Sequence, residues 1–217
     1  MTRRTALFSL AALLATAAPV TAAAETMAMK LLPVYSRATF KSDAPLETIV
    51  GNTAGDGVSG TLSFDPAKPS TATGTVKVDL KTVKTGVDKR DADMLGKGFL
   101  DVDAGDKNRY AVFELRSVEI AGPLENNKDL PAKVKGVLTI KGKPVDVTAD
   151  AVVRYVKLSP AQLTEDQKKF GFTSDNLKVR AKLGSTFTNH GMEVPQLLFL
   201  KVSNDIQLET DLTFVRQ

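Results

Sequence analysis

Apolar and polar side chains alternate along most of the chain. This spacing has the period of a β-strand, in which successive side chains point to opposite faces of a sheet. The segment 133–141 is a clear example, because Val134, Leu138 and Ile140 are opposed by lysines and a threonine. A shorter segment at 47–50 adds to eight longer ones. The eight lie at 34–41, 58–64, 76–81, 113–116, 133–141, 145–154, 178–183 and 206–214.

Eight two-faced strands predict an all-β protein. Sheets that show one face to water and bury the other are typically antiparallel. So many strands must close into a barrel or stack as a sandwich to hide their apolar faces. A sandwich is filled from both inner faces, whereas a barrel of about eight strands can leave room for one small ligand. The number of strands fits both architectures.

Small residues at the expected inward positions favour the hollow barrel. A packed core would favour Leu, Ile or Phe at these places, although a glycine in a strand can also mark a sharp bend. Their spread over five strands indicates space for a guest molecule. These residues are Ser36, Ala38, Gly60, Gly136, Ala149, Ala151 and Ala181.

Two segments break the alternation and predict short helices. The first is 88–95, where Asp88 can act as the N-cap. The second begins at Ser159, which precedes a proline, and can end at Gly171, with Leu163 and Phe170 as its apolar contacts. We expect these helices to cover a barrel mouth or a sheet edge, and a moving gate is the alternative.

The N-terminal segment has the pattern of a signal peptide. Arg3 and Arg4 precede an apolar run over 6–18 that is too short to span a bilayer, and small residues follow up to Ala24. We therefore expect cleavage after Ala24, export without stable membrane insertion, and one mature domain over 25–217. A buried core helix is the alternative. A chain without cysteine that is exported relies on its core alone, which is common in a bacterial periplasm.

Charge and composition exclude several functions. The chain without Arg3 and Arg4 holds 27 basic and 25 acidic residues, scattered along its length, which argues against nucleic-acid binding. The absence of cysteine excludes thiol chemistry, and His190 is the single histidine, expected in an exposed turn. The acidic run 101–106 lacks the ligand spacing of a calcium loop, and the glycine-rich stretch 51–60 lacks that of a phosphate loop. The sequence therefore predicts no enzyme, no metal site and no cofactor.

Several motifs together resemble the YceI-like periplasmic proteins, also called the polyisoprenoid-binding family. The order and spacing agree from about residue 35 to 153, and the segment 206–214 fits as well. Three features depart from the family pattern: Ala111 in place of a proline, a longer loop at 103–108, and a helical insertion at 159–176. The matching motifs are Tyr35–Phe40, Val58–Asp65, Val76–Gly86, Lys89–Leu95, Phe99–Asp101, Phe113–Ser117 and Val134–Gly142.

The resemblance implies a single lipocalin-like antiparallel barrel of eight strands, with one or two short helices at its mouth. It also implies a periplasmic binding or carrier protein that holds a long isoprenoid, such as a quinone tail or a polyprenyl chain. Leu95 and Phe99 are expected at the entrance. The other inward residues expected to bind the lipid are Ala38, Phe40, Leu62, Phe64, Val78, Phe113, Leu115, Leu138 and Ala149.

Plain barrel packing is the alternative for each of these residues. The main rival function is a stress-related or surface interaction module, with a solid barrel core and loops that bind protein partners. Of possible partners the sequence favours an apolar lipid over nucleic acid, and it leaves a homodimer open.

Overall fold

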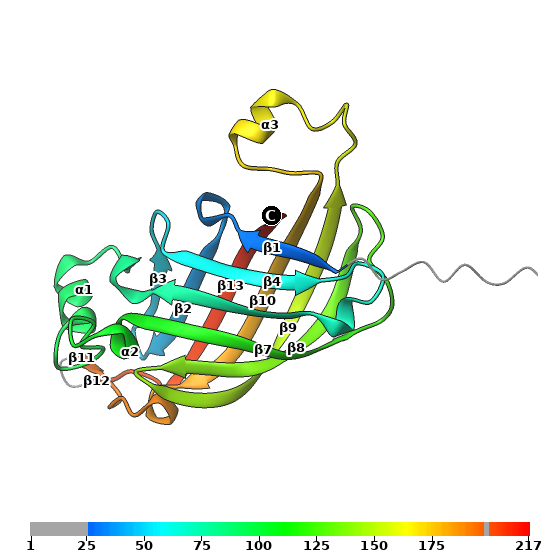
Figure 1. Cartoon of the computed structure of the whole chain (residues 1–217). Coiled ribbons are helices and arrows are strands. Elements are labelled where there is room, and N and C mark those ends of the chain that lie inside the picture. The colour runs from blue at the N-terminus through cyan, green and yellow to red at the C-terminus, as the bar shows by residue number, and fades with distance from the viewer. Residues whose placement is uncertain (1–25, 198–199) are drawn as a thin grey trace, which may run out of the picture.

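The computed structural model describes residues 26–197 and 200–217, and the expected signal peptide over 1–24 lies outside this range. The chain forms one large antiparallel sheet that curves around on itself (Figure 1). None of the helices in the described part is long and apolar enough to cross a membrane. The strands are β1 (Met27–Leu31), β2 (Arg37–Ala44), β3 (Glu47–Thr53), β4 (Val58–Phe64), β5 (Thr73–Asp79), β6 (Val83–Lys84), β7 (Tyr110–Ile120), β8 (Asp129–Ile140), β9 (Lys143–Lys157), β10 (Asp175–Thr186) and β13 (Asp205–Arg216), with a separate small pair β11 (Gln196–Leu197) and β12 (Leu200–Lys201).

Eight strands close the barrel in the order β1, β4, β5, β7, β8, β9, β10 and β13. Each neighbouring pair in this ring is antiparallel, and β13 returns to pair with β1. A closed ring leaves none of its strands with an unpaired edge, which a flat sheet of these strands would have. The predicted eight-stranded antiparallel barrel is therefore confirmed.

The barrel wall forks beside β13. Residues 214–216 of β13 pair with β1, whereas residues 207–211 pair with β2 on the same side of the strand. A one-turn 3-10 helix, Pro33–Tyr35, separates β1 from β2. From the fork, β1 continues the wall to β4, and β2 continues it through β3 to β6. Two partly independent stretches of wall thus share one long strand.

All eight predicted strand segments, and the shorter one at 47–50, overlap strands of this sheet, but Leu80 and Lys81 of the segment 76–81 lie in a 3-10 turn after β5. The sequence pattern missed β1, in which Met27, Met29 and Leu31 alternate as buried residues directly after the expected cleavage site. The pattern also placed Val34 on an inward face. In the structure Val34 lies in the 3-10 turn and is 72% exposed, because the proline before it ends the strand.

Two hydrophobic clusters lie toward opposite ends of the long strands. On β9, Ala151, Val153 and Tyr155 belong to the first cluster, and Val147 belongs to the second. The first cluster also contains the buried side chains of β1. The second contains residues of the loops after α1 and after β10, such as Leu100 and Phe187. The two clusters thus divide the barrel interior between its two ends.

The helices are short and lie outside the barrel wall. They are α1 (Asp88–Leu95), α2 (Asp106–Arg109) and α3 (Glu165–Lys169), and the further 3-10 turns are Pro69–Thr71, Leu80–Thr82 and Thr188–His190. The prediction at 88–95 is confirmed, but Asp88 is its first helical residue and not its cap. The residue in the cap position is Val87, which makes no side-chain cap hydrogen bond.

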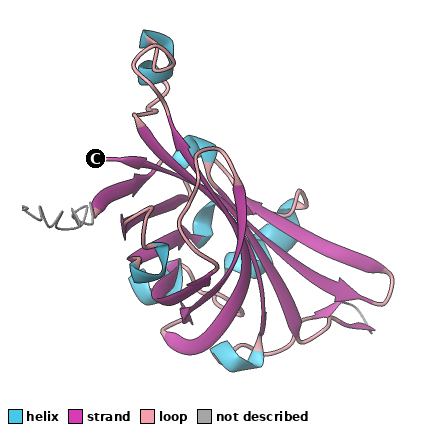
Figure 2. Ribbon diagram, turned by 90° about the vertical axis from the view of Figure 1, so that its right-hand side faces the viewer, coloured by secondary structure: helices cyan, strands magenta, loops and turns pink. Residues whose placement is uncertain are grey.

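The predicted helix after Ser159 is much shorter than expected. It forms only at Glu165–Lys169, because Thr164 and Gln167 make a reciprocal capping box at that point. The segment projects away from the barrel (Figures 1 and 2). Phe170 follows this helix and is 61% exposed, so it is not the buried contact that the sequence predicted.

Candidate ligand-binding cavity

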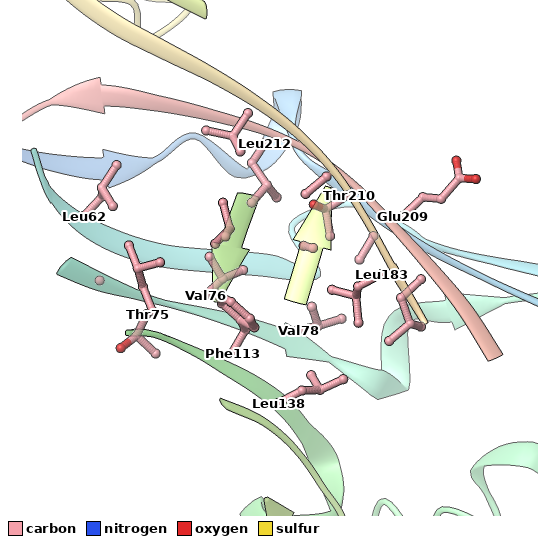
Figure 3. A pocket seen from close by; sticks show the side chains of 18 of the residues that line it. Leu62, Thr75, Val76, Val78, Phe113, Leu138, Leu183, Glu209, Thr210 and Leu212 are labelled. Carbon is pink, nitrogen blue, oxygen red and sulfur yellow. The ribbon is translucent and has the colours of Figure 1, made fainter. Parts of the chain in front are cut away.

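The middle of the barrel holds a cavity of about 230 Å³. One water molecule needs roughly 10–15 Å³ by the same measure, so the cavity is many times larger than a site for a single water. Its walls come from the inner faces of strands around the barrel, as the close view shows (Figure 3). The interior is therefore not a filled core, and the cavity is large enough to take part of an organic molecule.

Apolar side chains make up most of the cavity wall. Leu62, Val76, Val78 and Phe113 all point inward, yet each is only partly buried. The free surface of these side chains faces the cavity, since their strands pair on both sides. Apolar surface that faces an unfilled space lacks dispersion contacts on one side, and an apolar guest would supply them.

Nine of the eleven residues that the sequence predicted as lipid-binding line this cavity. They are Ala38, Phe40, Leu62, Phe64, Val78, Phe113, Leu115, Leu138 and Ala149. Leu95 and Phe99 lie elsewhere. Both pack on the second hydrophobic cluster, where the ring of Phe99 meets that of Phe187 edge-on at 5.4 Å between centroids. That the nine residues contact a lipid remains a prediction.

A row of small side chains explains why the middle of the barrel is open. Ala181 on β10, Thr210 on β13 and Ala38 on β2 are register partners that line the cavity. The row continues to Ala151 on β9 and Ala132 on β8, which pack in the first hydrophobic cluster. The neighbouring inward positions on β13 carry Leu208 and Leu212, which are much larger. The small-residue row therefore forms a wide level between two narrower ones.

Not every small inward residue provides free space. A Cβ added to Gly136 would lie 2.3 Å from Cζ of Phe113, so the ring already occupies the space above this glycine. Ser36 is buried, where its hydroxyl donates to the carbonyl of Leu32 and accepts from the amide of Thr213. The sequence argument for a guest is therefore correct for Ala38, Ala149 and Ala181, which line the cavity. It is wrong for the four small residues that do not line it, Ser36, Gly60, Gly136 and Ala151.

Sequence reasoning missed several residues of the cavity wall. Leu208, Leu212 and Phe214 lie on a strand whose alternation was recognised, so that signal was available. Thr53 and Thr210 also line the cavity. Their polarity hid them, because an alternation of apolar and polar residues assigns threonine to the outer face.

Charged side chains near the cavity turn outward. Glu209 borders the cavity through its backbone strand, but its carboxylate points away from the interior (Figure 3). Its Oε1 lies 2.9 Å from Nζ of Lys41 and 3.3 Å from Nζ of Lys182. Hydrogen bonds from these two lysines lower the pKa of Glu209. The charge of Glu209 is thus neutralised on the outer face.

His190 is fully buried, which contradicts the exposed turn predicted from the sequence. Its Nε2 lies 2.8 Å from Oγ of Ser185, and its Nδ1 lies 3.2 Å from the carbonyl oxygen of Lys143. Burial lowers the pKa of the imidazole. The histidine therefore connects its turn to the start of β9 and to the end of β10. It does not line the cavity.

The described residues hold no group of three or more His, Cys, Asp or Glu side chains that could bind a metal ion. In the acidic run 101–106, Asp103 instead pairs with Lys81, and Asn108 donates to the carbonyl of Asp101. The Asp103 carboxylate is therefore engaged in an ion pair, and the backbone of the loop is held by Asn108.

These features define a closed antiparallel β-barrel with an apolar internal cavity. A sequence model of the YceI-like domain matches residues 30–214, and the chain belongs to this family. No curated protein sequence matches the chain significantly.

Solved structures share the fold at low sequence identity. BcnA of Burkholderia cenocepacia is 19% identical with a TM-score of 0.58, over 82% of this chain and 95% of that one. A polyisoprenoid-binding domain from Saccharophagus degradans, implicated in plant cell wall breakdown, is 15% identical with a TM-score of 0.63, over 88% and 99%. The YceI protein of Campylobacter jejuni is 20% identical with a TM-score of 0.55, over 77% and 84%.

Proposed function

We propose that this protein is a periplasmic binding or carrier protein that holds a long apolar isoprenoid-type lipid, such as a quinone tail or a polyprenyl chain, inside its barrel. The observation that carries the proposal is the cavity of about 230 Å³, with its wall of Leu, Val, Phe and Ala side chains. Membership of the YceI-like family and the name of the Saccharophagus degradans domain support the isoprenoid as the guest. The signal-peptide pattern at the N-terminus supports the compartment.

The burial of hydrocarbon supplies enough free energy for such a complex. Each methylene moved from water into an apolar site gains roughly 0.8 kcal/mol, so about twenty buried carbons gain roughly 16 kcal/mol. Association itself costs about 4–15 kcal/mol. Binding on apolar contact alone therefore requires the buried carbons to outweigh this cost, which favours a long chain over a short one.

The rival function, an interaction module with a solid barrel, requires an interior without free space. The cavity and the partly exposed inward side chains argue against that interior. Binding of protein partners by the loops stays a prediction.

Lipid content is the direct test. Freshly purified protein is extracted with organic solvent, and the extract is analysed by mass spectrometry. We expect an isoprenoid at close to one molecule per protein. Protein that is folded, contains no lipid and takes up no added isoprenoid would contradict the proposal.

A cavity-filling variant tests where the lipid lies. Ala181→Leu places a larger side chain on the cavity wall, whereas Ala28→Leu makes the same change at an exposed position of β1. We expect Ala181→Leu to weaken isoprenoid binding at least about tenfold while the protein stays folded, because the added carbons take the space of the guest. Equal binding by the two variants would place the lipid elsewhere.

A further inference from the structure

Two threonines bring hydroxyl groups to the apolar wall of the cavity. Thr210 on β13 points inward, with Ala38 and Ala181 as its register partners on either side (Figure 3). Thr53 on β3 lies beyond Ala38 on the same level, and its Oγ1 accepts a hydrogen bond of 3.0 Å from the amide of Ala38. Both threonines line the cavity. They flank one alanine, so the two threonines lie on either side of Ala38 at the level of the small-residue row.

The hydroxyl of Thr210 has no hydrogen-bond partner among residues 26–197 and 200–217. That of Thr53 accepts from Ala38 and donates to none of these residues. A hydroxyl without a partner in an apolar environment is unfavourable, and valine has the same shape without this cost. Two hydroxyls that keep free hydrogen-bonding capacity toward a cavity therefore indicate a polar group in the guest.

The alanines on either side of Thr210 leave room for such a group. Ala38 and Ala181 carry only a methyl group each, so the Thr210 hydroxyl is not screened by its register neighbours. Larger apolar side chains, such as Leu183 and Leu212, stand on the adjacent levels (Figure 3). A polar group at this level would have apolar wall on both sides for the hydrocarbon attached to it.

The charges around the cavity exclude an ionised group at this place. No Lys, Arg or His side chain is among the described residues that line the cavity. Glu209, the one charged residue at its border, is held on the outer face by Lys41 and Lys182. A phosphate or carboxylate next to Thr210 would lose its water shell without gaining a cation, which is strongly unfavourable.

We propose that Thr210, assisted by Thr53, hydrogen-bonds an uncharged oxygen group of the bound lipid, either a hydroxyl or a carbonyl, in the middle of the barrel. The inference rests on the proposed function and narrows its ligand class. The guest is then an isoprenoid that bears an alcohol or a carbonyl, and neither a pure hydrocarbon nor a lipid whose charged head lies inside the barrel.

Three probes with one hydrocarbon skeleton test the proposal. They are geranylgeraniol, the hydrocarbon that lacks its hydroxyl, and geranylgeranyl diphosphate, each titrated into delipidated protein. We expect the alcohol to bind about tenfold more tightly than the hydrocarbon, which is the size of effect that one net hydrogen bond gives. We expect the diphosphate to bind more weakly than the alcohol.

Thr210→Val is the decisive variant, because it removes a hydroxyl that bonds to no described residue and keeps the shape of the side chain. It should abolish the preference for the alcohol and leave affinity for the hydrocarbon unchanged. Thr210→Ser, which keeps the hydroxyl, should retain the preference. Thr148→Val makes the same replacement at an exposed position of β9 and serves as the control. Thr53→Val is less suitable, since it would also leave the Ala38 amide without its acceptor.

The outcomes separate this inference from the function on which it rests. Equal affinity for alcohol and hydrocarbon in the unmodified protein, or a preference that survives in Thr210→Val, would overturn the threonine site and leave lipid binding intact. Tightest binding of the diphosphate would likewise overturn it. If none of the three probes binds, the result would instead contradict the carrier function itself, and the threonine site as well.

Discussion

Gly51 and Gly136 each make room for a phenylalanine ring from a neighbouring strand. A Cβ at Gly51 would lie 2.2 Å from Cε1 of Phe40, and the three nearest atoms all belong to that ring. A Cβ at Gly136 would meet Cζ of Phe113 at 2.3 Å and also the backbone oxygen of Glu114 at 2.5 Å. The Cβ at Gly51 would therefore collide only with a side chain that can move, whereas the Cβ at Gly136 would also collide with the backbone of β7.

This difference predicts different results for the two alanine variants. Both Gly51→Ala and Gly136→Ala should lower the free energy of unfolding by about 1–3 kcal/mol, the usual cost of overpacking. Adding Phe40→Leu should relieve the loss at Gly51, whereas adding Phe113→Leu should relieve the loss at Gly136 only in part. Urea denaturation measures each value. Gly184→Ala is the control, since nothing lies within 4 Å of its added Cβ; full relief at both sites would contradict the backbone contact.

His190, the single histidine of the sequence, should make stability depend on pH near neutrality. Burial lowers the pKa of its imidazole below the ordinary value of about 6.5, so the unfolded chain takes up a proton first as the pH falls. The free energy of unfolding should therefore be constant at higher pH and decrease below about pH 6.5, until the lowered pKa is passed.

Urea denaturation between about pH 5 and pH 8 measures this dependence. His190 is the single histidine, so His190→Gln, which still forms hydrogen bonds but does not titrate, should flatten the curve. An equally steep curve in the variant would show that another group causes the pH dependence.

At the scale of secondary-structure elements, three strands are tied together by one buried carboxylate. Asp175 at the start of β10 accepts hydrogen bonds from the hydroxyls of Tyr155 on β9 and Ser174, and it pairs with Arg216 on β13 at 3.3 Å. Burial alone would raise the pKa of Asp175, but these hydrogen bonds outweigh it and the pKa is lowered. The carboxylate is thus stabilised in its charged form at the end of the barrel where β1 joins.

We expect Asp175→Asn to lower the free energy of unfolding by about 1–3 kcal/mol at neutral pH, because it removes the charge that accepts from Tyr155 and Ser174 and pairs with Arg216. The pKa of this carboxyl is depressed in the folded state, so its stabilisation is present at neutral pH and is lost as the pH falls below about 4. The difference between the variant and the unmodified protein should therefore shrink in acid. Ser174→Ala, which removes a single donor, is a milder comparison. A difference that stays constant down to the acid limit would contradict this account.

Helices and strands could be predicted from the sequence where a pattern within the same segment determines them. All eight longer strands follow from periodicity, and the range of α1 follows from a break in that alternation. The helix after Ser159 could not be placed in this way, because two capping signals compete and the stronger one, Thr164 with Gln167, lies five residues further on. β1 was missed for another reason: its three buried residues follow a signal-peptide pattern that explained the same region.

At the scale of the whole molecule, the register between strands determines which small residues lie side by side, and the sequence alone does not predict this register. Inward positions such as Phe113 and Leu138 follow from alternation within one strand. The small-residue row depends on which residue of one strand faces which residue of the next, and no single strand contains that information. The same limit applies to His190, which contacts Ser185 on β10 and also the backbone of Lys143 on β9, a residue far away in the sequence.

The fork beside β13 also determines when the barrel can close. Met29 on β1 and Arg216 on β13 are register partners although almost the whole described chain lies between them, and β2 depends on the same strand. At roughly 5–20 residues per second, synthesis of the intervening chain takes on the order of ten to forty seconds. During that interval β1 and β2 lack their partner on β13, and β10 lacks it for the last part of the interval, which favours aggregation. The strand that pairs with all three is the last of the barrel to be made, so the barrel closes only after that strand has been synthesised.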